Sequence, residues 1–174
     1  MIKNEDVAPL RHINISIDKD IAQYKEDGFE GFIPVAILRD ATSILPEEAG
    51  VYVVIRKSNA APQFLEKGSG GFFKGKNPNV SIEVLTENYV TDSKTVYIGK
   101  ASNLRKRVGQ LLSFGAGVAV GHWGGRFLWQ LADSDGLIVA WKTTPECDPR
   151  AIEAQMIQNF VSVYGKRPFA NLKD

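Results

Sequence analysis

Two tyrosines of this 174-residue chain stand out, because their side chains could take part in chemistry together. Tyr52 lies in the segment VYVVIR and Tyr97 in TVYIG, and both segments are rich in β-branched and aromatic residues. That composition predicts two strands. Either tyrosine alone would be an ordinary sheet aromatic, but two neighbouring strands would bring the phenols close together.

A glycine and a set of basic residues follow the second of these strands. Gly99 and Lys100 come directly after Tyr97-Ile98, and Arg105, Lys106 and Arg107 follow on the next expected helix. A glycine allows the backbone to approach a phosphate closely, and Lys and Arg side chains can neutralise and grip it. A plain strand-to-helix turn with an exposed basic helix face is the alternative interpretation.

Two further side chains could move a proton or hold a metal. His122 precedes WGGR, where an imidazole could transfer a proton or contact a phosphate, unless it is simply a capping histidine. Glu153 has apolar residues three, four and seven positions after it, which places its carboxylate on or beside the apolar side of the last expected helix. Such a carboxylate needs an Arg partner or a metal. A single carboxylate suits Mg²⁺ held largely by water and phosphate, and does not suit Zn²⁺.

The composition excludes several classes of protein. Hydrophobic residues make up 44% of the chain, yet no apolar run approaches the roughly 18 residues of a membrane span. The N-terminal sequence MIKNEDVAPLRH lacks the apolar stretch of a signal peptide, and the single Cys147 excludes a disulfide framework and a Cys-based zinc site. We therefore expect a cytoplasmic protein with no membrane partner.

The net charge of +1 hides an uneven distribution along the chain. Residues 1–50 hold ten acids and five bases, whereas residues 51–174 hold ten acids and sixteen bases. The segment 94–131 has six bases and no acid, which is typical of a surface that binds DNA or RNA. A solvated basic face without a partner explains the same pattern. The near-neutral total predicts that non-specific affinity is modest and is lost as salt increases.

Periodicity and turn residues predict an α/β fold. Strands are expected at 51–56, 95–99 and 137–141, and helices at about 103–114, at 125–132, and from the Asp148-Pro149 pair to Tyr164, with Gly165 as the C-cap. Ser102 is the expected N-cap of the first of these helices. The core is then a small, mainly antiparallel three-stranded sheet flanked by helices.

Two segments lie outside this core. Residues 1–48 form an N-terminal extension that packs on or leads into the core, with a strand expected at Ile13–Ile17 and a helix or loop at 19–27. Residues 49–174 form the main domain, which carries an insertion at 57–93 with one short strand at 81–85. A connection of that length is usually functional, partly structured or mobile.

Taken together and in order, these residues resemble the GIY-YIG nuclease domain over about residues 49–172. The first motif is Gly50-Val51-Tyr52, with Val in place of Ile, and the second is Tyr97-Ile98-Gly99. The run YIGKASNLRKRV is similar to the catalytic domain of the bacterial nucleotide-excision-repair incision nuclease. The resemblance implies a GIY-YIG-type fold and divalent-metal-dependent hydrolysis of phosphodiester bonds, most often in DNA.

The resemblance also assigns roles to residues of this chain. Glu153 would bind the metal, Mg²⁺ or Mn²⁺, and Tyr52 or Tyr97 would activate or position water. The residues expected to be catalytic are Tyr52, Tyr97, Lys100, Arg107, His122 and Glu153. The resemblance and the basic segment at 94–131 together predict the residues that bind nucleic acid: Gly99, Arg105, Lys106, Arg126 and Asn171.

The insertion is the main departure from the family pattern, because 44 residues separate Tyr52 from Tyr97. Its stretch 67–79 mixes Phe72 and Phe73 with lysines, as a DNA-contacting element would. Two alternatives to a DNA nuclease stay open: a catalytically inactive nucleic-acid-binding module on the same fold, and an RNA-directed nuclease or toxin. The oligomeric state is left open, with a monomer favoured.

Overall fold

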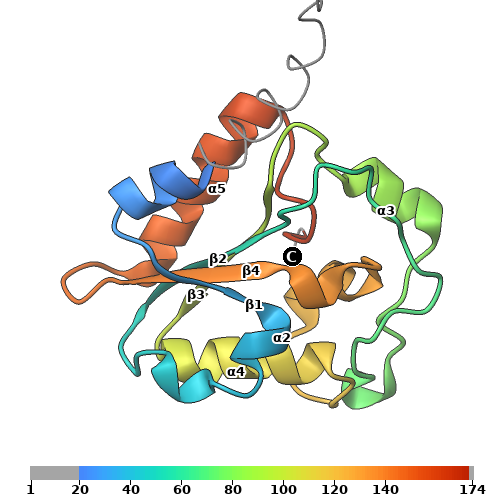
Figure 1. Ribbon diagram of the computed structural model, residues 1–174, viewed down its shortest axis with the longest axis horizontal. Helices are drawn as coiled ribbons and strands as arrows, with labels where there is room; N and C mark the ends of the chain where they lie inside the picture. The colour runs from blue at the N-terminus through green and yellow to red at the C-terminus, as the bar shows by residue number, and fades with distance from the viewer. Residues whose placement is uncertain (1–19, 173–174) are drawn as a thin grey trace, which may run out of the picture.

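A single antiparallel sheet organises the protein in the computed structural model, which describes residues 20–172 (Figure 1). The strand order is β1-β4-β2-β3, so β1 and β3 are the edge strands. The inner strand β2 is buried at all six residues, as its continuous apolar sequence requires. The strands are β1 (Glu30–Pro34), β2 (Gly50–Ile55), β3 (Thr95–Ala101) and β4 (Ile138–Thr143).

The expected α/β class and antiparallel pairing are confirmed, but the sheet has four strands where the sequence predicted three. The additional strand, β1, belongs to the N-terminal segment and pairs with β4. Its register shifts between Gly31 and Ile33, and both Gly31 and Phe32 have positive φ angles. This bulge interrupts the alternation by which a strand is usually identified.

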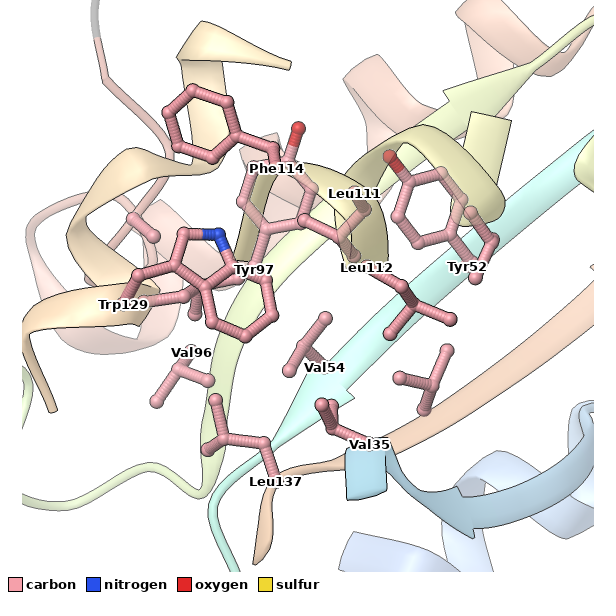
Figure 2. Packing of buried hydrophobic residues seen from close by; sticks show 14 of the residues in the cluster. Val35, Tyr52, Val54, Val96, Tyr97, Leu111, Leu112, Phe114, Trp129 and Leu137 are labelled. Atoms are coloured by element: carbon pink, nitrogen blue, oxygen red, sulfur yellow. The ribbon is translucent and has the colours of Figure 1, made fainter. Parts of the chain in front are cut away.

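Helices cover both faces of the sheet (Figure 1). One face packs against α5 (Pro149–Tyr164) and a helical segment at residues 20–26, which lies within the stretch where a helix or a loop was expected. The opposite face packs against α4 (Leu104–Gly115), α2 (Val35–Leu38) and the 3₁₀ segment η3 (Trp123–Gln130). Figure 2 shows the side chains of this larger cluster, including Tyr52, Tyr97, Phe114 and Trp129.

The helix ends follow the expected capping residues with one exception. Asp148 caps α5 by accepting a hydrogen bond from the Arg150 backbone N–H, and Gly165 is the C-cap. At α4 the N-cap is Asn103 in place of Ser102, and its side chain accepts from the Lys106 N–H. The helix expected at 125–132 is the 3₁₀ segment η3, which begins two residues earlier.

The insertion at 57–93 contains a helix, α3 (Ile82–Asn88), so the strand predicted at 81–85 was wrong. Ser81 caps this helix, and Leu85 is its only buried residue. Buried Gln130 of η3 anchors the insertion, because its side-chain amide donates to the carbonyls of Leu65 and Val80 and accepts from the Val80 N–H. The remaining short 3₁₀ turns are η1 (Thr42–Ile44), η2 (Phe73–Gly75) and η4 (Ser134–Gly136).

The strand predicted at Ile13–Ile17 lies outside the described residues. Across residues 20–172, none of the helices has the length and apolar character needed to cross a bilayer.

Candidate active site

The two motif tyrosines meet a histidine on the α4 face of the sheet. Tyr52 on β2 and Tyr97 on β3 have ring centroids 6.0 Å apart, and His122 lies 6.5 Å from Tyr52 and 5.9 Å from Tyr97. The Tyr52 hydroxyl and His122 Nε2 are hydrogen-bonded at 2.8 Å. Figure 2 shows both tyrosines arising from these adjacent strands. The expectation that the phenols lie close together is confirmed.

The motif glycines make this arrangement sterically possible. Gly99 is paired directly with Tyr52 across the two strands, and a Cβ at position 99 would lie 2.3 Å from Tyr52 Cζ. A Cβ at Gly50 would lie 2.2 Å from the Lys142 carbonyl oxygen of β4. Both positions therefore exclude any side chain. Gly99 makes room for the Tyr52 ring, and the phosphate contact expected of this glycine from the sequence stays a prediction.

Burial fixes the protonation of His122 and Tyr52. His122 is fully buried, and this burial, together with the nearby Arg107 cation, lowers its pKa to about 3. Burial and the neighbouring Tyr97 raise the pKa of Tyr52 well above the ordinary value, although Arg107 opposes the rise. At neutral pH the imidazole is therefore uncharged and Tyr52 keeps its proton.

A cleft of about 480 Å³ lies beside this cluster, at the β3 edge of the sheet. Tyr97 lines it with the 7% of its surface that is exposed, whereas Tyr52 and His122 are fully buried and take no part in its lining. Four of the six residues expected to be catalytic line this cleft: Tyr97, Lys100, Arg107 and Glu153.

Lys100 and Glu153 enter the cleft from the other face of the sheet. Lys100 is two residues after Ile98, which packs toward α5, and successive alternate residues of a strand share a face. Its Nζ lies 2.6 Å from Oε2 of Glu153 on α5. The Lys100 side chain is 44% exposed and that of Glu153 only 16%. The cleft thus joins a phenol from one face of the sheet with an ion pair from the other, across the edge strand.

Arg107 projects from α4 toward the same cleft. Its Nη1 donates to the Gly121 carbonyl at 2.7 Å and to Gln110 Oε1 at 3.1 Å. These two acceptors fix one side of the guanidinium, and a planar guanidinium has five N–H donors in all. Arg107 is consequently oriented by the protein and can still bind an anion in the cleft.

The cleft offers one carboxylate for a divalent metal. Among residues 20–172, no three His, Cys, Asp or Glu side chains come together in a group that could hold a metal. Mg²⁺ commonly binds through one or two carboxylates, water and substrate phosphate, so Glu153 alone fits Mg²⁺ or Mn²⁺ and does not fit a zinc site. Because Lys100 contacts Glu153 Oε2, a metal would compete with its ammonium group.

Two of the residues expected to bind nucleic acid lie elsewhere on α4. Arg105 is held by the N-terminal segment: it donates to the carbonyls of Leu45 and Ser43 and forms an ion pair with Glu47 at 2.8 Å. Lys106 is exposed and lies outside the cleft, in a neighbouring hollow. The structure therefore brings Arg107 into the cleft without the two bases that precede it.

Asn171 and Arg126 have structural contacts of their own. Asn171 Oδ1 accepts from the Ile98 N–H at 2.9 Å and its Nδ2 donates to the Ile98 carbonyl at 2.8 Å, so this amide covers the edge of β3 beside the cleft. Arg126 stacks on Trp123, with its guanidinium carbon 4.7 Å from the ring centroid. Arg126 does not line the cleft.

Sequence reasoning missed Arg167, which lines the cleft and donates to the Leu172 carbonyl at 2.9 Å. Its position in the segment RPFAN, four residues before Asn171, was the available signal. The rings of Phe73 and Trp123 also line the cleft. With Arg167 included, three cations and one carboxylate face the same cleft, which favours an anionic ligand.

Comparison with family models, with curated proteins and with solved structures finds no match to this chain. The chemistry of the cleft is therefore inferred from its own residues.

Proposed function

We propose that this protein is a metal-dependent endonuclease of the GIY-YIG type that hydrolyses phosphodiester bonds in DNA. One observation carries the proposal: Tyr97, Lys100, Arg107 and Glu153, which are far apart in the sequence, line one cleft. Phosphodiester hydrolysis needs a positioned water, stabilisation of the negative charge that develops on the phosphate, and a proton acceptor. The cleft contains a residue suited to each task.

Arg107 is the residue that grips the scissile phosphate. Hydrogen bonds to Gly121 and Gln110 hold its guanidinium, so little side-chain freedom is lost when an anion binds. An arginine can bind phosphate through two parallel N–H donors. Arg167 adds a second cation on the lining of the cleft.

Tyr97 is the residue that touches the attacking water. Tyr52 is fully buried and retains its proton, so it cannot serve as a base at neutral pH. Tyr97 lines the cleft, and the cations Lys100 and Arg107 line it as well. These cations would offset the negative charge that a tyrosine gains if it gives up its proton to act as a base toward water. Tyr52, held by His122, then acts as a positioning residue behind Tyr97.

Glu153 would hold the divalent metal, which when bound supplies charge stabilisation at the phosphate and a more acidic water. Lys100 neutralises this carboxylate in the structure described here. Because the cleft provides one carboxylate, we expect metal to bind more tightly when a phosphate is also present.

One observation favours a second function, a nucleic-acid-binding module without catalysis. Lys100 contacts Glu153 at 2.6 Å, and an ion pair that stayed closed would leave no carboxylate for a metal. Such a protein would bind DNA or RNA through the same cations and would not cut it.

A cleavage assay separates these functions. Supercoiled plasmid is incubated with the purified protein in Mg²⁺, in Mn²⁺ and in EDTA, with labelled single-stranded DNA and RNA in parallel. Nicking that needs the metal, and that is lost in both Glu153→Gln and Arg107→Ala, is the expected result.

Two matched variants control for the loss of charge in this assay. Glu83→Gln and Lys57→Ala remove the same charges from exposed positions that do not line the cleft, and they should cut normally. Binding of nucleic acid with no cleavage in either Mg²⁺ or Mn²⁺ would instead support the binding module. Cutting of RNA alone would move the substrate from DNA to RNA.

A further inference from the structure

A second hollow, here called the basic hollow, adjoins the cleft between the starts of α4 and α5. It has a volume of about 410 Å³. Its charged lining residues are Lys100, Lys106, Arg107, Asp148 and Arg150. Four cations therefore face one carboxylate, and that carboxylate is already engaged, because Asp148 Oδ1 accepts from the Arg150 N–H at 3.0 Å.

Three of these cations have no acidic partner. Among residues 20–172, ion pairs form at Arg39, Arg56, Lys100 and Arg105, and none forms at Lys106, Arg107 or Arg150. Like charges that share a concave surface repel one another unless an anion neutralises them. The basic hollow thus presents unneutralised positive charge at a site of defined shape.

The basic hollow is continuous with the cleft. Lys100 and Arg107 line both, so they form the boundary between the two. A polyanion with one phosphate at Arg107 in the cleft would pass directly over this boundary. The chemistry of the basic hollow matches the next phosphates of such a chain.

We propose that the basic hollow binds the backbone phosphates that flank the scissile phosphate in the cut strand, through Lys106 and Arg150. This inference rests on the proposed function and adds where the substrate strand runs. Contacts to backbone phosphates carry no base information, so this part of the surface sets affinity and register and does not set sequence preference.

Binding is tested apart from cleavage, with a fluorescein-labelled DNA oligonucleotide, by anisotropy in EDTA at several KCl concentrations. The double variant Lys106→Ala/Arg150→Ala should weaken binding about tenfold or more at low salt. It should also reduce the slope of log K against log[KCl] by about 1.4 to 1.8, since each phosphate contact contributes about 0.7 to 0.9.

Two other variants of this chain serve as matched comparisons. Lys25→Ala/Lys57→Ala removes the same charge from exposed positions that line neither hollow, and it should keep the wild-type slope. Asp148→Asn removes the one carboxylate of the basic hollow and keeps a good N-cap, so it should bind more tightly than wild type.

Equal slopes in the two double variants would overturn the proposal, because net charge alone would then explain the affinity. If the wild type also cut DNA, the proposed function would stand while the path of the strand would be wrong. If the wild-type protein binds with the expected slopes and cuts nothing, the basic hollow would stand as a phosphate site and the nuclease function would be refuted. A wild type that binds no nucleic acid would refute both.

Discussion

Lowering the pH from 7.5 to 5 should destabilise the folded protein through one buried side chain, His122. Its pKa is lowered from 6.5 to about 3, first by burial and then by Arg107. In the unfolded chain the same imidazole takes up a proton near pH 6.5. The unfolded state therefore binds more protons than the folded state as the pH falls below 6.5, and the free energy of unfolding must decrease.

The size of the effect follows from these two pKa values. Between pH 7.5 and 5, proton uptake stabilises the unfolded state by about 2 kcal/mol, while the folded state, with its pKa of about 3, gains almost nothing. A folded-state pKa one unit higher would reduce the difference by less than about 0.1 kcal/mol. For a chain of this size, about 2 kcal/mol corresponds to a decrease in Tm of roughly 4–8 °C.

Urea denaturation at pH 7.5, 6.5, 5.5 and 5 would measure this loss in the wild type and in His122→Gln. The variant keeps a polar side chain near the Tyr52 hydroxyl but has no titrating group at position 122, so its stability should change about 2 kcal/mol less than that of the wild type. Taking the difference between the two proteins removes the contribution of the carboxylates, which titrate in both.

Parallel pH profiles of the wild type and the variant would refute the reasoning. So would a native-state NMR titration in which the His122 ring resonance, assigned by its loss in the variant, shifts with a midpoint above pH 5. The NMR result remains decisive even if His122→Gln folds poorly.

Three further predictions concern the strands that build the cleft. Gly99→Ala places a Cβ 2.3 Å from the fully buried Tyr52 ring, so we expect the free energy of unfolding in urea to fall by about 1–3 kcal/mol. An unchanged free energy of unfolding would contradict this, because it would mean that the Tyr52 ring shifts without cost. Asn171→Ala removes two hydrogen bonds to the Ile98 backbone and should cost about 2 kcal/mol, with faster amide exchange at Ile98; unchanged exchange would contradict this. If the proposed function holds, Tyr97→Phe should reduce the cleavage rate by about 10²-fold or more in folded protein, and normal cleavage would remove Tyr97 from the chemistry.

The parts of the fold that the sequence predicted are those encoded by local signals. The buried strand β2 follows from a continuous apolar run, and both ends of α5 follow from Asp148-Pro149 and Gly165. The segment SIEVLTEN misled because its β-branched residues favour a strand, whereas Ser81 caps a helix there and only Leu85 needs burial. The strand β1 was missed because its pairing with β4 is long-range and its bulge interrupts the alternation.

The candidate site was predictable where strand pairing alone positions the residues. Antiparallel pairing of β2 with β3 is enough to bring Tyr52 near Tyr97. Residues two positions apart on a helix point about 200° apart, so Arg105 and Arg107 could not both face the cleft. Composition cannot say which of them does, because the answer depends on where the N-terminal segment carrying Glu47 packs.

The insertion leaves the sheet and returns to it at one place: Ile55 is paired with Thr95, and the Arg56 N–H donates to the Lys94 carbonyl at 2.8 Å. The β2–β3 ladder already holds its two ends together, and the entropic cost of a closed loop rises only slowly with its length. The segment between them can therefore be shortened, lengthened or exchanged as a cassette, provided that the replacement covers the apolar surface around Gln130. In such chimaeras the pairing of Tyr52 and Tyr97 would be inherited from the sheet, while the Phe73 side of the cleft would change with the cassette.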